Sequence, residues 1–152
     1  MSNFKTLADI SKIIKEMPVK DIEAEAKAIA HQNQLTKPPG ALGILEELAV
    51  FLSSWQRTTK PSLKTVQALV FAGNHGICAQ GVNPFPQGVT KQMVENFKAG
   101  GAAINQLCEV SGADLNIVPL SLDDPTADFT EEEAMSELDL CEAIEIGARS
   151  VN

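Results

Sequence analysis

The segment V-Q-A-L-V-F-A-G, from Val66 to Gly73, is the strongest indication of the fold class of this chain. It is a short apolar run that ends in glycine, which is typical of a buried strand in a parallel sheet. A second run of this kind, D-L-N-I-V-P-L, extends from Asp114 to Leu120. Helical patterns separate the two runs, and strands that alternate with helices indicate parallel βα units. We therefore predict an α/β fold with a parallel sheet flanked by helices.

The predicted sheet is small. Two parallel strands leave edges with unpaired backbone groups, which α/β folds normally cover with further strands. We therefore expect the two strands to be part of a larger sheet.

Apolar residues recur with helical spacing through most of the remaining chain. It predicts helices over residues 6–15, 21–31, 42–56, 89–99, 102–110 and 136–147. Asp21 should cap the second helix, and Ser136 with Asp139 three residues later should cap the last one. The small or apolar positions that share one face of the second helix are Ile22, Ala26, Ile29 and Ala30. We expect Trp55 to anchor the far end of the third helix in the core.

Composition and charge exclude several classes of protein. The chain has 152 residues, of which 44% are hydrophobic and 21% charged, as in ordinary globular domains. Its net charge is −8, with 12 Lys and Arg against 20 Asp and Glu, so a nucleic-acid partner is not expected. The acids gather between Asp123 and Glu145. We interpret this run as a solvated helix face.

The cysteine pattern and the absence of long apolar runs indicate a reduced, cytoplasmic protein. Cys78, Cys108 and Cys141 are widely spaced and odd in number, so a disulfide framework is not expected. His75 and Cys78 have metal-ligand spacing, but His31 is the only other histidine, and no metal site is predicted. No run approaches the ~18 apolar residues of a membrane span, and we expect no membrane association.

The segment after the first strand is the first place to look for function, because ligands of open α/β sheets bind beyond the carboxyl ends of the strands. It reads G-N-H-G-I-C-A-Q-G-V-N-P-F-P-Q-G-V-T, from Gly73 to Thr90. A stiff apolar loop with one ring and a few amides suits a flat heteroaromatic ligand. The alternative is that Phe85 and the prolines only pack the loop, and composition does not decide between the two.

Two further features also have two interpretations. His75 has a side chain that can act as an acid or a base near neutral pH, but a turn-holding role is the alternative. Gly100 and Gly101 precede a predicted helix, where backbone N–H groups can receive a phosphate. The same glycines would equally allow two helices to meet closely at a corner.

Several motifs together resemble the nicotinate-nucleotide–dimethylbenzimidazole phosphoribosyltransferases. In order along the chain they are L-T-K-P-P-G-A-L-G (35–43), V-F-A-G-N-H-G (70–76), G-V-N-P-F-P-Q-G-V-T-K-Q-M-V-E-N-F (81–97), G-G-A-A-I-N (100–105) and E-A-M-S-E (133–137). The resemblance covers the chain from about Asp21 onward. It implies a Rossmann-like α/β domain joined to a small helical domain, in a homodimer that uses no cofactor. We expect residues 1–33 to belong to the helical domain and residues 34–152 to the α/β domain.

The resemblance also implies an activity and a binding site. Family members transfer the phosphoribosyl group of nicotinate mononucleotide to 5,6-dimethylbenzimidazole, giving α-ribazole 5′-phosphate and nicotinate for the lower ligand of cobalamin. By family position the substrate-binding residues are Asn74, His75, Asn83, Phe85, Pro86 and Gln87. Asn74 stands where many relatives have Asp, and Asn83 and Pro84 replace commoner small residues.

The resemblance places the catalytic glutamate and the glycine-rich phosphate-binding segments downstream of the position of Asn152. We therefore assign no catalytic residue within this sequence and expect the isolated chain to be inactive. Glu131, Glu132 and Glu133 occupy a different family position. The alternative function is a truncated, non-catalytic module that binds an aromatic base or supports dimerisation.

Overall fold

The computed structural model describes residues 4–151, and these form two compact units. One unit contains the described residues up to Lys15 together with those from Thr65 onward, and the other contains Glu16–Lys64. The boundary expected from the sequence, after residue 33, lies inside the second unit. The division of the complete protein into domains stays a prediction.

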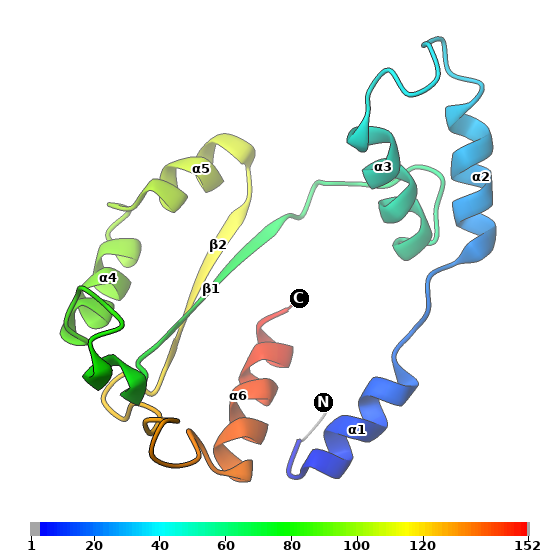
Figure 1. Cartoon of the computed structure of the whole chain (residues 1–152). Helices are drawn as coiled ribbons and strands as arrows, with labels where there is room; N and C mark the ends of the chain where they lie inside the picture. Colours follow the sequence, from blue (N-terminus) through cyan, green and yellow to red (C-terminus); the bar gives the residue numbers. More distant parts are fainter. Residues whose placement is uncertain (1–3, 152) are drawn as a thin grey trace. The chain divides into compact units, whose positions relative to one another are not determined.

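The first unit is built on a two-stranded parallel sheet, as the sequence predicts. Strand β1 (Gln67–Gly73) pairs with β2 (Asp114–Leu120), in a register that runs from Gln67 opposite Asp114 to Gly73 opposite Leu120. Between the strands the chain forms α4 (Gly88–Lys98) and α5 (Ala103–Ser111), which contact the sheet and lie along one side of it (Figure 1). The predicted α/β class is confirmed.

The strands are less buried than their apolar sequence suggests. Within β1 only Ala72 is buried, and the Phe71 side chain is 44% exposed. The expectation of a buried strand is therefore wrong for the described part of the chain. Parallel strands become buried when helices and further strands cover both faces and both edges, and α4 and α5 do not provide that cover for a sheet of two strands.

The two glycines between α4 and α5 form a corner. Gly100 has a φ of +80°, and a Cβ on Gly101 would overlap the Asn96 side chain. The Asn105 side chain closes the corner, because its Oδ1 accepts from the Ala102 N–H at 3.1 Å and its Nδ2 donates to the Phe97 carbonyl at 2.9 Å. These contacts favour the structural interpretation of the glycine pair over a phosphate site.

Two terminal helices complete the first unit. Helix α6 (Glu137–Ser150) begins with the predicted capping box, in which Ser136 Oγ accepts from the Asp139 N–H. Helix α1 (Leu7–Glu16) lies beside its start, where the Leu7 N–H donates to Glu137 Oε1 at 2.9 Å. Cys141 is almost wholly buried, and this burial raises the pKa of its thiol. The N-terminal helix thus belongs to the unit that contains the sheet.

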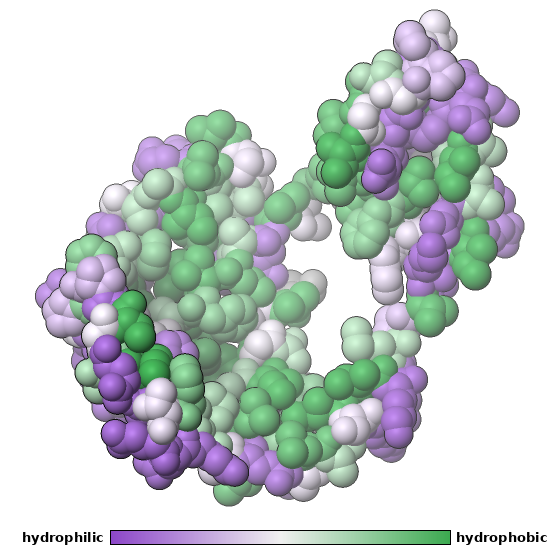
Figure 2. Space-filling view, in the orientation of Figure 1, coloured by the Kyte–Doolittle hydropathy of each residue, from purple (hydrophilic) through white to green (hydrophobic). Residues whose placement is uncertain are grey.

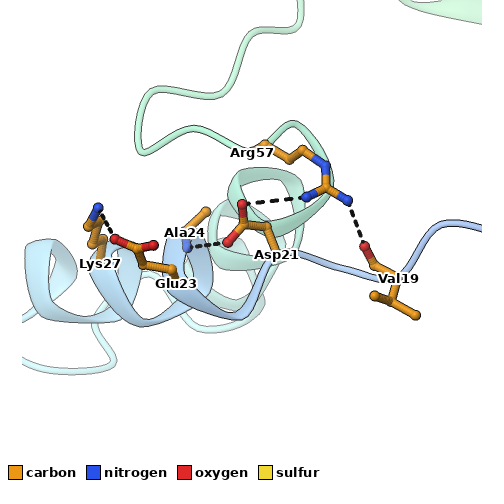
Figure 3. Close-up of polar contacts among 6 residues, drawn as sticks. All are labelled: Val19, Asp21, Glu23, Ala24, Lys27 and Arg57. Carbon is orange, nitrogen blue, oxygen red and sulfur yellow. Dashed lines mark hydrogen bonds and ion pairs between the residues drawn. The ribbon is translucent and has the colours of Figure 1, made fainter.

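The second unit is a helical hairpin whose first helix is capped as predicted. Helix α2 (Ile22–Gln32) is followed by α3 (Ile44–Trp55), and Asp21 Oδ1 accepts from the Ala24 N–H at 2.9 Å. Arg57, just after α3, reaches back to the same cap (Figure 3). Its guanidinium lies 3.6 Å from Asp21 Oδ2 and donates to the Val19 carbonyl at 3.1 Å. These contacts connect the residues just before α2 to the residue just after α3.

The packing of the hairpin differs from the sequence prediction. The buried residues are small ones, Ala24 and Ala28 in α2 and Ser53 and Ser54 in α3. On the predicted face of α2 Ile22 is 72% exposed, and Trp55 is 47% exposed, so its expected place in the core is wrong. Two helices bury only the narrow stripe along which they meet, and small side chains let them approach closely. Figure 2 shows the hydrophobic residues left on the surface of this unit.

The proline-glycine segment between α2 and α3 is an ordered turn, as predicted. Lys37 Nζ lies 2.7 Å from Glu46 Oε1, which also accepts from the Leu42 N–H at 3.1 Å. These two hydrogen bonds hold the pKa of the Glu46 carboxyl below its usual value. Gly40 and Gly43 have positive φ values that glycine adopts without strain.

Candidate functional site

A cavity of about 400 Å³ lies at the carboxyl ends of β1 and β2. Three segments form its walls: the end of β1, the segment that follows β2, and the start of α6 with the residues before it. The polar residues that line it include Asn74 and His75 from the first segment, Ser121 and Thr126 from the second, and Ser136 from the third. The cavity occupies the position at which α/β sheets generally bind ligands.

The segment after β1 and the segment after β2 are held together through their backbones. His75 and Thr126 form an isolated parallel bridge. The Gly76 N–H donates to the Thr126 carbonyl at 2.8 Å, and the Thr126 N–H donates to the Asn74 carbonyl at 3.2 Å. The Asn74 side chain adds a third link, because its Nδ2 donates to the Leu122 carbonyl at 2.7 Å.

This close approach explains the glycine at position 76. A Cβ there would lie 2.5 Å from the Asp128 nitrogen and 2.6 Å from the Thr126 carbonyl oxygen, well inside van der Waals contact. Because those atoms belong to the backbone, the segment could not move aside at small cost. Gly76 therefore lets the wall of the cavity form.

A short 3-10 helix η1 (Gly76–Gln80), which the sequence analysis did not predict, carries a further link. Gln80 Nε2 donates to Asp128 Oδ2 at 2.7 Å, and the N–H and hydroxyl of Thr130 both donate to Asp128 Oδ1. The hydrogen bonds from Thr130, and next that from Gln80, hold the pKa of the Asp128 carboxyl below its usual value. Asp128 thus joins η1 to the segment after β2.

The charged residues in the cavity wall are acidic, apart from the histidine at position 75. Asp124, Glu132, Glu133 and Asp139 all line the cavity. The interpretation of residues 123–145 as a solvated helix face is wrong for residues 123–136, because that part contains no helix and its backbone folds over the strand ends. Their position after the second predicted strand, Asp114–Leu120, was a sequence signal that could have placed them near the strand ends.

The structure brings two of the six predicted site residues into the cavity wall. Asn74 and His75 line the cavity, whereas Asn83, Phe85, Pro86 and Gln87 are not among the described residues that line it. The first three of these four are exposed, and the Phe85 ring is 64% exposed.

The loop that carries Phe85 is nevertheless attached to the cavity wall. Gln87 is half-buried, and its Nε2 donates to the His75 carbonyl at 2.7 Å. Asn83 Oδ1 accepts from the Phe85 N–H at 3.1 Å, which shapes the turn that presents the ring. Ligand binding by this loop stays a prediction.

The described part of the chain contains neither a cluster of metal ligands nor a membrane-spanning helix. No group of three or more His, Cys, Asp or Glu residues between residues 4 and 151 is placed to hold a metal ion. Among the helices of the same residues, none is long and apolar enough to cross a membrane. Cys78, Cys108 and Cys141 are all free thiols.

The fold and the cavity define an α/β protein with a ligand site at the carboxyl ends of parallel strands. Comparison with known proteins then identifies the family. A family model described as phosphoribosyltransferase matches residues 17–152, and the chain belongs to this phosphoribosyltransferase family.

The individual relatives agree with this assignment. The chain is 53% identical over 152 residues to the nicotinate-nucleotide–dimethylbenzimidazole phosphoribosyltransferase of Rhodobacter capsulatus, and 49% identical to that of a Ruegeria species. A crystal structure of the enzyme of this name from Thermus thermophilus has a TM-score of 0.79 and 36% identity over 84% of this chain. The chain spans about 45% of the length of these relatives, and all of it is aligned with the first two.

Proposed function

We propose that this chain supplies part of the active site of an enzyme that transfers the phosphoribosyl group of nicotinate mononucleotide to 5,6-dimethylbenzimidazole. One ring nitrogen of the base forms a bond to the ribosyl carbon, while the bond to nicotinate breaks and its electrons leave with nicotinate. The proton on the other ring nitrogen passes to a general base. The products are α-ribazole 5′-phosphate and nicotinate.

The observation that carries this proposal is the 400 Å³ cavity at the strand ends, in a chain that belongs to the phosphoribosyltransferase family. Cavities of this size accommodate small ligands. The relatives of about 50% identity are named for this reaction. The cavity wall that this chain supplies is acidic, which disfavours a phosphate and suits the uncharged base. We therefore assign the base to this wall.

Within the proposed site, Asn74 and His75 belong to the wall, and Asn83, Phe85, Pro86 and Gln87 form the rim. The exposed Phe85 ring would be covered by the base when it binds, since aromatic rings gain from offset stacking. Gln87 holds the rim loop against the His75 carbonyl. No general base is assigned within this wall and rim, and the acids of residues 131–133 are not given that role.

Separate titrations of the full chain with 5,6-dimethylbenzimidazole and with nicotinate mononucleotide test the proposal, followed by an assay of nicotinate release with both present. Phe85→Ala should weaken binding of the base roughly 3- to 10-fold, the range expected for loss of one aromatic contact. Phe129→Ala is the matched control, because Phe129 is 66% exposed and Phe85 is 64% exposed. Base affinity that is equal in the two variants would contradict the assignment of the rim loop.

The alternative is a non-catalytic module that binds an aromatic base or supports dimerisation. The exposed Phe85 ring and the exposed apolar side chains of α3 would supply the surfaces for these two roles. Such a module should bind the base and ignore the nucleotide, whereas a catalyst binds both and releases nicotinate.

Three accompanying proposals concern the whole protein. We propose a homodimer, a cytoplasmic location in keeping with the free thiols, and a small helical domain to which residues 1–33 contribute. The exposed apolar side chains of α3, among them Ile44, Leu48 and Phe51, support an association of this kind.

A further inference from the structure

We infer that the outer edge of β1, the edge that faces away from β2, is a docking site for one further strand. This strand comes from the part of the phosphoribosyltransferase fold that lies outside these 152 residues, and it pairs with β1 and not with β2. The docking site depends on the backbone of the two strands and on the family, and it is independent of the proposed reaction.

The register of the sheet shows which backbone groups lie at the outer edge of β1. The Asp114 N–H donates to the Val66 carbonyl at 2.9 Å. Because successive residues of a strand turn their backbone groups to opposite edges, the even-numbered residues of β1 face β2, whereas Leu69 and Phe71 face away from it. Within residues 4–151, the N–H and carbonyl groups of Leu69 and Phe71 make no hydrogen bond. This edge therefore offers donors and acceptors to a further strand.

The other strand, β2, is less suited to accept a neighbour. By the same alternation, the residues of β2 that face away from β1 are Leu115, Ile117 and Pro119. Pro119 has no N–H to donate, and proline within sheets is found mainly on edge strands. β2 also contains the charged Asp114, whereas β1 contains neither a charged residue nor a proline. Charge and proline protect the outermost strands of natural sheets, so β2 has the features of an outermost strand and β1 lacks them.

The end of α6 indicates the direction of the further strand. The Ser150 carbonyl accepts from Gln67 Nε2 at 3.0 Å, so the last turn of α6 lies beside the first residue of β1. Val151 follows with extended backbone angles, φ −90° and ψ 124°. A helix that returns to the start of a strand is the usual connection to a parallel neighbour in the sheet. Chain that continues from α6 as a strand would thus run parallel to β1 along its outer edge.

A second copy of the chain fits this edge less well. The net charge of −8 lies entirely on the unit that contains the sheet, so two such edges would meet against charge repulsion. The whole chain is aligned with the Rhodobacter capsulatus relative, of which it covers only 46%. The strand is therefore assigned to the part of the fold that is unmatched in this relative.

The test compares the chain alone with the same chain joined, in one polypeptide, to the unmatched part of the Rhodobacter capsulatus relative. Backbone amide exchange is measured in both proteins. In the joined protein the amides of Leu69 and Phe71 should exchange at least about tenfold more slowly than in the chain alone, because each gains a hydrogen bond. The amides of Leu115 and Ile117 should exchange rapidly in both proteins, because they stay without a partner strand.

A matched pair of proline variants removes one outward N–H from each strand. Leu69 and Leu115 are both half-buried, and both face away from the partner strand, so neither substitution removes a bond between β1 and β2. Leu69→Pro should lower the urea midpoint of the joined protein more than that of the chain alone, because it blocks the new pairing. Leu115→Pro should shift the two midpoints equally. The Val70 amide, which faces β2, reports whether the sheet persists in each variant.

The outcomes are distinct. Slower exchange at Leu69 and Phe71, with the larger effect of Leu69→Pro in the joined protein, supports the docking site. Slower exchange at Leu115 or Ile117 would place the strand on β2 and overturn it, as would unchanged exchange at all four amides. Protection of Leu69 and Phe71 in the chain alone that increases with protein concentration would assign the edge to a second copy, which also overturns the proposal. None of these measurements uses the base or the nucleotide, so failure of the proposed function would be seen separately.

Discussion

At the scale of single residues, the cavity depends on the absence of a side chain at position 76. The backbone from Thr126 to Asp128 occupies the space that a Cβ would fill. The adjacent parallel bridge between His75 and Thr126 brings the two segments this close. Glycine at position 76 therefore allows the segment after β1 and the segment after β2 to approach this closely.

Replacement of this glycine should be destabilising. We expect Gly76→Ala to lower the free energy of unfolding by about 1–3 kcal/mol, the usual cost of inserting a methyl group into a packed site. Gly147→Ala is the matched control, because Gly147 lies in α6 and has no heavy atom within 4 Å of a built Cβ. It should raise stability by about 0.5–1 kcal/mol through helix propensity. Urea titration of both variants measures this, and equal stabilities would contradict the close packing.

Trp55 offers a second prediction at this scale. It is the single tryptophan of the sequence, its side chain is half exposed, and its ring centroid lies 6.2 Å from that of Phe51. We expect acrylamide to quench its fluorescence efficiently in the folded chain, because the indole is open to solvent. Phe51→Ala should increase the quenching further. Weak quenching that urea enhances strongly would instead indicate a buried indole, covered by a part of the protein or by a partner.

At the scale of secondary-structure elements, the start of α6 is fixed by a reciprocal capping box. Asp139 Oδ2 accepts from the Ser136 hydroxyl at 2.6 Å and from the Ser136 N–H at 3.0 Å. These hydrogen bonds, the one from the hydroxyl first, hold the pKa of the Asp139 carboxyl below its usual value. The carboxylate also lies in the first turn, where the helix dipole favours negative charge. Since Ser136 and Asp139 line the cavity as well, the box places α6 against the proposed site.

The capping box predicts a pH dependence of stability. Because the folded-state pKa of Asp139 is depressed, its contribution is present above the unfolded-state pKa of about 3.9 and is lost as the pH falls through the folded-state value. Asp139→Asn should therefore be less stable than the unsubstituted chain at neutral pH, and the difference should shrink below about pH 4. Glu142→Gln, an exposed change in the same helix, controls for lost charge. A difference that stays constant with pH would exclude this account.

The helical hairpin illustrates how elements can be well formed and still leave their large side chains uncovered. Its helices meet through alanine and serine, whereas the isoleucine, leucine and aromatic residues of α2 and α3 stay largely exposed. Burial of such side chains provides most of the free energy of folding and association. The hairpin is therefore the part of the chain best suited to further packing.

At the scale of the whole molecule, charge is unevenly distributed between the two units. Residues 16–64 carry six Lys and Arg and six Asp and Glu, so the net charge of −8 lies entirely on the other unit. Both units expose large apolar side chains. Association between copies is thus favoured by apolar burial and opposed by repulsion between the acidic units.

This balance predicts association that increases with salt. Raising the ionic strength from about 0.01 M to about 0.15 M shortens the screening length from ~30 Å to ~8 Å and weakens the repulsion. Sedimentation equilibrium of the full chain should then show a larger average mass. Leu48→Glu, on the exposed face of α3, should reduce the association, whereas Glu47→Gln should not. An average mass that does not change with salt would show that charge repulsion does not oppose the association.

Local sequence patterns were sufficient to predict the α/β class, both strands, the six α-helices of residues 4–151 to within a few residues, the caps at Asp21 and Ser136, and the family. These features depend on local patterns such as apolar period, capping residues and contiguous motifs, which the chain carries irrespective of its tertiary contacts. Three features became apparent only in the folded chain: several acids after Asp123 line a cavity, Trp55 is exposed, and the Asn74 side chain donates to the Leu122 carbonyl. The physical reason is that a cavity wall joins residues far apart in sequence, and their meeting depends on which faces pack, which no local pattern encodes.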